Sequence, residues 1–316
     1  MATGKSDHWS EYWSRGCLTS LPQDFSANYD GEVAEFWQRV FCSISHLDRM
    51  IDLCTGNGAI ALLAADYAQK KAPGLNITAV DAATVSPQAI LQKYPAQARL
   101  LDRIRFIDNC RVEDIDLPAS TFDLVTSQYG IEYCDWQLAA VKVQQLLKPG
   151  GRLVLVTHTA TSDIMKFMEQ EQREYTQLEQ LRFFSAIKGY LSQEISFAQL
   201  RSRLARIQVE IGSIFSKSGS PLFRSVLGML AGALQMDQAA LEKERVHLEE
   251  YYAQIRHGFD RLTDMLRVNH AIRSDPDWYR VFVTAGLELE DSGEIRYKGR
   301  HHAGSFFIFT KPGDNG

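Results

Sequence analysis

The sequence predicts an α/β fold: an open, doubly wound sheet with helices on both faces. The clearest observation is residues 50–65, MIDLCTGNGAIALLAA, where a short apolar run, a glycine turn and a run of helix formers follow one another. That order is typical of a strand–turn–helix crossover unit. Two further observations agree. Four more apolar segments have strand character, at 77–80, 105–107, 120–127 and 152–157, and a helical segment at 136–147 separates the last two.

The composition is that of an ordinary globular protein, with 316 residues of which 45% are apolar and 23% charged. A formal charge of −5 gives no electrostatic footprint for nucleic acid. The five cysteines are scattered with no C-x-x-C pair, so neither a disulfide framework nor a metal site is predicted. The N-terminus lacks a signal-type apolar run, and no segment approaches the roughly 20 apolar residues of a membrane span. We therefore expect a cytoplasmic protein that contacts no membrane.

The turn after the first strand differs from the common phosphate-binding loops. A dinucleotide fold would show G-x-G-x-x-G, and a phosphate loop would end in Gly-Lys-Ser/Thr. Here Asp52 precedes the turn, Cys54 stands where a first glycine could be, and Gly56 and Gly58 follow without a lysine. An acid at this position would repel a pyrophosphate but suits a cationic or amine-bearing ligand. An ordinary tight turn without a ligand is the alternative.

Three segments together resemble the class I S-adenosylmethionine-dependent methyltransferases. The turn is similar to their motif I, D-x-G-x-G-x-G, with a mild departure at Cys54. Residues 120–125 are similar to their S-F-D-x-V segment, and residues 147–153 to their L-K-P-G-G-x-L turn. The resemblance covers residues 45–158 and 277–311. It implies a Rossmann-like sheet of seven strands with an antiparallel last hairpin, S-adenosyl-L-methionine as cofactor, and methyltransferase activity.

The resemblance assigns the cofactor to the ends of the first three strands. An acid at the end of the second strand can accept hydrogen bonds from both ribose hydroxyls, the role that the family gives to the position of Asp81. The family holds the adenine after the third strand, near the Val112 backbone and Glu113. The alternatives are a helix N-cap for Asp81 and a solvated turn for Glu113 and Asp114. The predicted cofactor-binding residues are Asp52, Cys54, Thr55, Gly56, Asn57, Gly58, Asp81, Ala82, Val112, Glu113 and Gln128.

Residues 128–133, after the fourth strand, lie where family members place catalytic or substrate-orienting groups. They lack the [D/N]-P-P-[Y/F] sequence of many amino-methylating enzymes that act on nucleic acids. Glu132 could act as a base and Tyr129 could orient the acceptor, while His158 follows the neighbouring fifth strand. We predict these three as catalytic residues. The alternatives are that Glu132 caps the helix beginning at Trp136, and that these side chains are pocket walls or packed residues.

Residues 1–45 are rich in aromatic side chains and form a predicted N-terminal cap segment. Tyr12, Trp13 and Tyr29 lie in loop-like sequence. In the family, such segments commonly cover the cofactor and line the substrate pocket, and a facing aromatic ring can attract the sulfonium cation. We predict these three residues and Tyr133 as substrate-binding. The alternative is that the aromatic side chains only dock the segment onto the sheet.

The predicted core, residues 46–159 and 276–316, is interrupted by a long segment that the sheet does not need. This insertion, residues 160–275, has a helical pattern almost throughout, and its last helix carries a heptad stripe. The stripe consists of Leu241, Leu248, Ile255 and Leu262, with Tyr252, Phe259 and Leu266 beside them. It could pack inside the insertion or form a homodimer. An insertion after the fifth strand is also well placed to be a lid.

The predicted function is transfer of the sulfonium methyl group to a nucleophilic O, N, S or C atom of a small molecule. In-line displacement needs mainly proximity and orientation, with a base where the nucleophile carries a proton. An acidic composition and a large cap favour a small-molecule acceptor. Two alternatives stay open: methylation of a protein or an RNA, and a non-catalytic S-adenosylmethionine-binding protein that assembles through its heptad helix.

Overall fold

The computed structural model describes residues 7–20, 27–159, 163–299 and 301–313. The chain forms two compact units, the first made of Met1–Asp163 with Arg267–Gly316 and the second of Ile164–Leu266. The first unit contains the predicted sheet, and the second contains most of the predicted insertion. None of the described helices has the length and apolar character that a membrane span requires.

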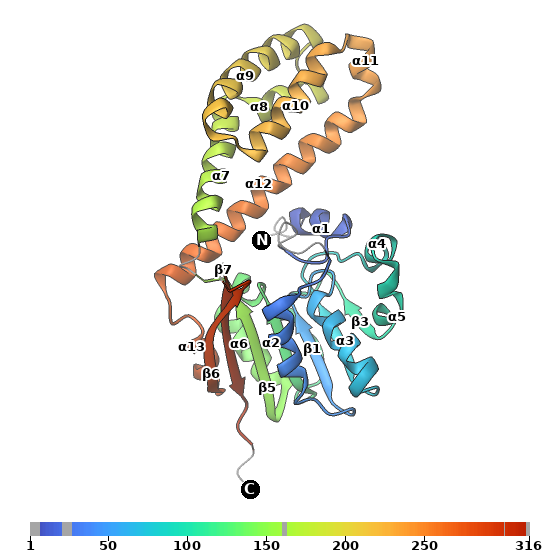
Figure 1. The fold of residues 1–316 in the computed structure, drawn as a ribbon, viewed down its shortest axis with the longest axis vertical. Coiled ribbons are helices and arrows are strands. Elements are labelled where there is room, and N and C mark those ends of the chain that lie inside the picture. The colour runs from blue at the N-terminus through green and yellow to red at the C-terminus, as the bar shows by residue number, and fades with distance from the viewer. Residues whose placement is uncertain (1–6, 21–26, 160–162, 300, 314–316) are drawn as a thin grey trace. The chain divides into compact units, whose positions relative to one another are not determined.

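The first unit is built on one sheet of seven strands in the order β3-β2-β1-β4-β5-β7-β6 (Figure 1). Strands β1 to β5 are parallel, and β7 lies antiparallel between β5 and β6. This arrangement confirms the predicted Rossmann-like sheet and its antiparallel last hairpin. The bounds are β1 Arg49–Leu53, β2 Asn76–Val80, β3 Ile104–Ile107, β4 Phe122–Gln128, β5 Leu147–Thr157, β6 Glu288–Tyr297 and β7 His301–Thr310.

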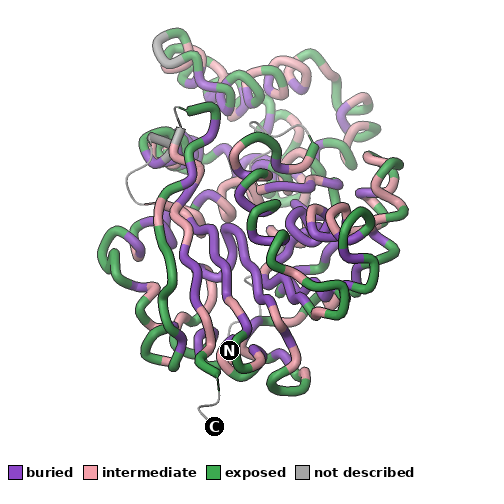
Figure 2. The backbone as a smooth tube through the Cα atoms, turned by 60° about the horizontal axis from the view of Figure 1, so that its bottom comes forward, coloured by how far each residue is buried: buried purple, intermediate pink, exposed green. Residues whose placement is uncertain are grey.

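Helices cover both faces of this sheet. The helices of this unit are α1 Asp7–Ser14, α2 Gly31–Phe41, α3 Ala59–Lys71, α4 Pro87–Lys93, α5 Ala98–Leu101, α6 Trp136–Leu146 and α13 Arg280–Thr284, with the short turns η1 Pro95–Gln97, η2 Val112–Asp114 and η3 Ile131–Tyr133. Because successive strand residues face opposite sides, Met50 packs with α2 and α3, whereas Ile51 packs with α6 and α13. The central strands are accordingly buried along most of their length (Figure 2).

The N-terminal segment departs from the prediction. Tyr12 and Trp13 lie on α1 and not in a loop, whereas Tyr29 does lie outside helices and strands. Trp9 and Trp13 are four residues apart, one helical turn, and their rings stack with centroids 6.0 Å apart. The loop-like sequence after Trp13 is the turn that follows the helix, where Gly16 has a φ of 69°.

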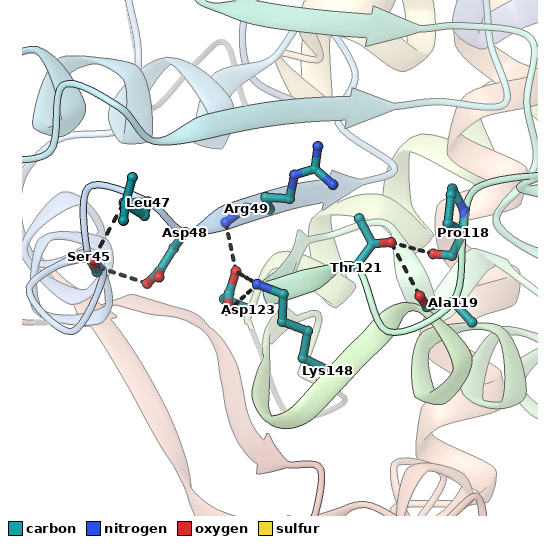
Figure 3. Close-up of polar contacts among 9 residues, drawn as sticks. All are labelled: Ser45, Leu47, Asp48, Arg49, Pro118, Ala119, Thr121, Asp123 and Lys148. Carbon is teal, nitrogen blue, oxygen red and sulfur yellow. Dashed lines mark hydrogen bonds and ion pairs between the residues drawn. The ribbon is translucent and has the colours of Figure 1, made fainter.

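One carboxylate joins the amino ends of three adjacent parallel strands (Figure 3). Asp123, near the start of β4, accepts a hydrogen bond from the backbone N–H of Arg49 in β1 at 2.8 Å. Both of its oxygens also accept from the Lys148 ammonium group in β5, at 2.8 and 2.7 Å. This contact fixes the relative position of β1, β4 and β5 at the sheet edge opposite their carboxyl ends.

The second unit is helical in its described part, as predicted. Its elements are α7 Asp163–Gln180, α8 Phe183–Leu191, α9 Phe197–Ser218, α10 Pro221–Gln235, α11 Gln238–Lys243 and the first part of α12 Arg245–Ser274. A turn at residues 219–220 separates α9 from α10. Gly219 ends α9 in a left-handed conformation with a φ of 63°, and Ser220 is the N-cap of α10.

The heptad stripe is packed inside this second unit. Its members Leu241, Leu248, Ile255, Leu262, Leu266, Tyr252 and Phe259 all belong to, or pack against, one hydrophobic cluster. The prediction of one continuous helix is wrong, because Glu244 leaves helical geometry (φ −90°, ψ 8°) between α11 and α12. Near the end of α12, Val268 and Ile272 pack instead in the sheet cluster of α6 and α13. A homodimer through the insertion helices stays a prediction.

Candidate active site

The strand order reverses between β1 and β4, which lie next to each other while β2 and β5 continue outward in opposite directions. Ligands of open α/β sheets bind beyond the carboxyl ends of the strands at such a switch point. The predicted site residues follow these ends: the glycine turn after β1, Asp81 after β2, residues 129–133 after β4 and His158 after β5. The fold therefore brings them to one edge of the sheet.

Asp52 lies on β1, one residue before its end, and is almost fully buried (1% exposed). Its carboxylate oxygens accept hydrogen bonds from Thr126 Oγ1 at 2.7 Å and from Thr55 Oγ1 at 2.5 Å. Burial raises the pKa of Asp52 to about 7, a larger effect than the lowering by these hydrogen bonds. The carboxylate thus connects β1, the glycine turn and β4.

Three residues of the turn have a left-handed backbone conformation: Cys54 (φ 54°), Gly56 (φ 54°) and Gly58 (φ 87°). The motif I pattern has glycine at the position of Cys54, and the positive φ explains that preference. The cysteine adopts this conformation at a steric cost of about 1–2 kcal/mol. Gly58 is the N-cap of α3, so the first backbone N–H groups of that helix lie at the ligand edge.

Asp81 follows β2 directly, and its carboxylate reaches the glycine turn. Oδ2 accepts a hydrogen bond from the Gly56 N–H at 2.7 Å, and Oδ1 accepts one from the Ala83 N–H at 2.8 Å. Burial raises the pKa of Asp81 to about 6, although both hydrogen bonds lower it. The N-cap alternative is wrong, because the hydroxyl of Ser86 caps α4 by accepting from the Ala89 N–H.

The turn η2 contains the predicted adenine-binding residues. Val112 is buried, and the Glu113 side chain is only 7% exposed. Glu113 Oε1 accepts hydrogen bonds from the Asp135 N–H at 2.8 Å and from Arg111 Nη2 at 3.1 Å. The solvated-turn alternative is therefore wrong for Glu113, whereas the Asp114 side chain is 68% exposed. Adenine binding by Val112 and Glu113 stays a prediction.

Asn57 fastens the N-terminal segment to the glycine turn. Its Nδ2 donates hydrogen bonds to the carbonyls of Trp13 and Cys17, each at 2.8 Å, and its Oδ1 accepts one from the Ser86 N–H at 2.8 Å. The Trp13 ring lies against Gly56, where an added Cβ would come within 2.6 Å of the ring. Trp13 therefore contacts the predicted cofactor turn, and its role toward the substrate stays a prediction.

Contacts from two distant segments hold the loop after β4. Gln128 Oε1 accepts a hydrogen bond from Trp37 Nε1 of α2 at 2.5 Å. Tyr129 has a φ of 53°, and its hydroxyl donates to the Ala303 carbonyl of β7. The ring of Tyr29 meets the Tyr129 ring edge-on, with centroids 6.2 Å apart. The predicted residues Gln128, Tyr129 and Tyr29 thus lie together.

Glu132 and His158 form a hydrogen-bonded pair in which Glu132 is buried and His158 is partly exposed. The Glu132 side chain is 0% exposed, and its Oε1 accepts from the His158 backbone N–H at 2.9 Å and lies 2.7 Å from His158 Nδ1. Oε2 is buried without a hydrogen-bond partner in the described part of the chain. The cap alternative for Glu132 is wrong, because Asp135 caps α6 by accepting from the Leu138 N–H at 3.0 Å. A buried carboxylate oxygen without a partner can accept a hydrogen bond from a ligand.

Aromatic rings border this pair. The Tyr129 and Tyr133 rings lie 5.0 and 5.9 Å from the His158 ring, and the Trp9 ring meets the Tyr133 ring edge-on at 6.0 Å. We call Trp9, Tyr129 and Tyr133 the aromatic wall. Tyr12, also predicted at the site, packs edge-on against Trp13 and donates its hydroxyl to the Thr19 carbonyl at 2.8 Å.

Three residues that the sequence did not mark contact the predicted site. Thr126 binds Asp52, Trp37 binds Gln128, and Trp9 completes the aromatic wall. The sequence signal for Trp37 was its place on the apolar face of a helix, which predicts core packing and not a polar contact. Sequence spacing could not have revealed these contacts, because the first two join residues 74 and 91 positions apart.

A sequence model of the family described as "Methyltransferase domain" matches residues 44–217. Among curated proteins, the demethylmenaquinone methyltransferase of Thermus thermophilus is 32% identical over 109 residues, 34% of this chain and 46% of the relative. That of Chlamydia muridarum is 28% identical over 195 residues, 60% of this chain and 78% of the relative. The 2-phytyl-1,4-naphtoquinone methyltransferase of Synechococcus elongatus is 32% identical over 39% of this chain and 52% of the relative. The chain thus spans about half the length of most of these relatives.

Solved structures with a similar fold include the geranyl diphosphate C-methyltransferase of Streptomyces coelicolor. It is 16% identical, with a TM-score of 0.39 over 50% of this chain and 67% of that one. An S-adenosylmethionine-dependent methyltransferase from Mesorhizobium loti is 24% identical, with a TM-score of 0.29 over 41% of this chain and 56% of that one.

Proposed function

Because the chain belongs to the methyltransferase-domain family, within the class I superfamily that uses S-adenosyl-L-methionine, we propose that it transfers the methyl group of this cofactor to a small-molecule acceptor. The observation that carries the proposal is the pair of buried acids, Asp52 and Asp81, placed on both sides of the glycine turn at adjacent strand ends. When bound, S-adenosylmethionine supplies an electrophilic methyl group on a sulfonium centre.

The residues around the turn fit this cofactor. Asp81 would accept hydrogen bonds from the ribose hydroxyls, since each of its oxygens has lone-pair capacity beyond the one backbone N–H that it now accepts. The Val112 backbone and Glu113 would border the adenine. The Asp52 carboxylate, when ionised, would attract the cationic end of the ligand, because a ligand bound at the turn lies close to it and Coulomb attraction is strong at short distance.

For the acceptor we propose a planar ring that carries an ionisable hydroxyl group, of the hydroquinone type. The aromatic wall beside His158 supports this proposal, because flat rings stack or meet edge-on with ring substrates. The unpartnered Oε2 of Glu132 supports it too, because a hydroxyl donor would satisfy that atom. Relatives named for menaquinone and naphthoquinone substrates point in the same direction.

The Glu132–His158 pair would accept the proton that the acceptor hydroxyl loses. With Glu132 Oε1 accepting from Nδ1–H, the Nε2 atom of His158 keeps a lone pair and can take a proton from the acceptor hydroxyl. Glu132 stabilises the imidazolium that then forms, and its buried position holds the ring in one orientation. Tyr129 and Tyr133 would limit the orientations open to the acceptor ring.

The test is turnover of 1,4-naphthohydroquinone with isotope-labelled S-adenosylmethionine by the wild type and by Glu132→Gln and His158→Asn. Base catalysis typically contributes about 10²–10⁴-fold, so we expect kcat to fall by that amount in both variants at saturating cofactor. His270→Asn, an exposed histidine on α12, serves as the matched control and should retain wild-type turnover.

A loss of less than about threefold in both variants would reject the base, since general bases contribute far more. If the wild type binds S-adenosylhomocysteine but turns over no hydroquinone, the acceptor class is wrong while the cofactor assignment stands.

A further inference from the structure

We propose that Cys54 and Cys134 form a reversible disulfide that weakens cofactor binding, so that the site responds to peroxide. The two Sγ atoms lie 3.7 Å apart, although the residues are 80 positions apart in the sequence. Both side chains are half-buried, and all five cysteines of the chain are free thiols. This inference concerns regulation of the proposed cofactor site and therefore rests on the proposed function.

The two cysteines belong to the two loops that form the site. Cys54 is in the glycine turn, with its backbone in the left-handed conformation, and Cys134 directly follows η3, two residues after Glu132. The backbone of Gly130 runs against Cys54, since a Cβ added at Gly130 would lie 2.2 Å from the Cys54 Cβ. The loops are therefore in direct contact and have no spare room between them.

Disulfide formation would shift this contact. The sulfur atoms would have to approach from 3.7 Å to about 2.05 Å, the length of an S–S bond. The backbone at Cys54 already has a conformation unfavourable for an L-residue, so it has little freedom to follow the sulfur without moving its neighbours. Those neighbours include Thr55 and Gly56, which bind Asp52 and Asp81. Closing the bond should therefore displace the groups proposed to hold the cofactor.

The chemistry balances with one peroxide molecule. A thiolate of the pair attacks one oxygen of hydrogen peroxide and becomes a sulfenic acid, while the other oxygen leaves and, with the released proton, forms water. The second thiol then displaces the sulfenic hydroxyl as water and forms the S–S bond. Two thiols are oxidised, and hydrogen peroxide is reduced to two molecules of water.

The resting state of the pair is reduced. The hydrogen bond with Cys134, followed by burial, raises the pKa of the Cys54 thiol well above its ordinary value. A neutral thiol is a poor nucleophile, so the two cysteines stay reduced until the concentration of peroxide is high. Once one cysteine has become a sulfenic acid, the nearby sulfur of the other cysteine nevertheless favours disulfide formation over further oxidation.

The experiment uses the full chain treated with hydrogen peroxide, followed by thiol counting, peptide mapping by mass spectrometry, and calorimetry with S-adenosylhomocysteine. We expect the thiol count to fall from five to three, because two of the five are consumed, with one cross-linked peptide containing Cys54 and Cys134. The affinity for S-adenosylhomocysteine should fall about tenfold, a usual size for coupling between two sites, and dithiothreitol should restore it. By the same linkage, bound S-adenosylhomocysteine should protect the pair from oxidation.

Two variants distinguish the effect of oxidising Cys54 and Cys134 from the effect of oxidising other residues. Cys134→Ser should bind S-adenosylhomocysteine normally and keep that affinity after peroxide. Cys42→Ser, which removes an exposed cysteine at the end of α2 and outside both loops, should respond as the wild type does. Five remaining thiols, a disulfide between other cysteines, or an oxidised pair with unchanged affinity would each overturn the proposal. If the reduced wild type fails to bind S-adenosylhomocysteine, the proposed function falls, while thiol counting still decides whether the pair forms.

Discussion

Asp52 and Asp81 are carboxyl groups held almost completely out of water, and burial raises their pKa values to about 7 and about 6. The ordinary value of both is 3.8, so the folded protein holds protons that the unfolded chain has already lost as the pH rises. Their contribution to stability is therefore complete below pH 3.8 and is lost as the pH rises through the folded values. At neutral pH the buried negative charges of these two groups lower the stability of the folded, ligand-free protein. A bound cationic ligand can offset this destabilisation.

We predict that the free energy of unfolding of the ligand-free protein falls between pH 5 and pH 7 more steeply in the wild type than in Asp52→Asn. The window lies between the ordinary value of 3.8 and the folded value of about 7 for Asp52. Urea denaturation at several pH values measures this slope. Asp66→Asn, which alters an exposed acid paired with Lys70, is the control and should keep the wild-type slope. Equal slopes for Asp52→Asn and the wild type would contradict the raised pKa.

The sequence marked Asp52, Asp81, Glu132 and His158 correctly as strand-end residues at one sheet edge, because strand ends are predictable from apolar runs. The side-chain contacts between distant segments around the site were not predictable from apolar runs. The contacts of Trp37 with Gln128, and of Cys54 with Cys134, depend on how distant segments pack. The roles proposed for these residues toward ligands stay predictions.

At the scale of elements, Asn57 links the end of α1 and the turn after it to the sheet unit. This amide is fully buried, and it makes three hydrogen bonds to the backbone of the N-terminal segment and of the loop before α4. The sequence predicted the strands and helices of the sheet well, because their apolar patterns are regular. It missed α1, because an eight-residue helix is too short for periodicity to distinguish it from a loop.

We predict that Asn57→Ala lowers the free energy of unfolding by about 2 kcal/mol, since three hydrogen bonds are lost and a buried polar group loses its partner. The tryptophan fluorescence of the folded state should also change, because Trp13 is released from the glycine turn. Asn76→Ala, at an exposed position at the start of β2, is the control and should change neither. An unchanged fluorescence spectrum in Asn57→Ala would mean that α1 is held by other contacts.

At the scale of the whole molecule, the chain divides into a sheet unit and a helical unit, each with its own hydrophobic cluster. From the length between the fifth strand and the last hairpin, the sequence predicts an insertion at residues 160–275, and most of this range lies in the helical unit. It did not predict that Val268 and Ile272, near the end of α12, pack with the sheet. The heptad stripe gives no signal there, because the positions that would continue it are Asn269 and Arg273.

The lid function expected for the insertion can be tested by replacing residues 164–266 with a short flexible linker, which keeps Val268 and Ile272 in the sheet cluster. We predict that affinity for S-adenosylhomocysteine stays within about threefold of the wild type, whereas turnover of an acceptor is lost, since a lid excludes water and positions the substrate. Full turnover by the shortened protein would show that the insertion serves assembly and not catalysis.

The measurement that tests the cofactor assignment most directly is calorimetric titration of S-adenosylhomocysteine into the wild type, Asp81→Ala and Asp102→Ala. Removing the charged acceptor of the ribose hydroxyls should cost about 1.5–3 kcal/mol, so Asp81→Ala should bind at least about tenfold more weakly than the wild type. Asp102→Ala removes an exposed acid at the end of α5 and should bind as the wild type does. Wild-type affinity in Asp81→Ala would contradict the placement of the cofactor at these strand ends.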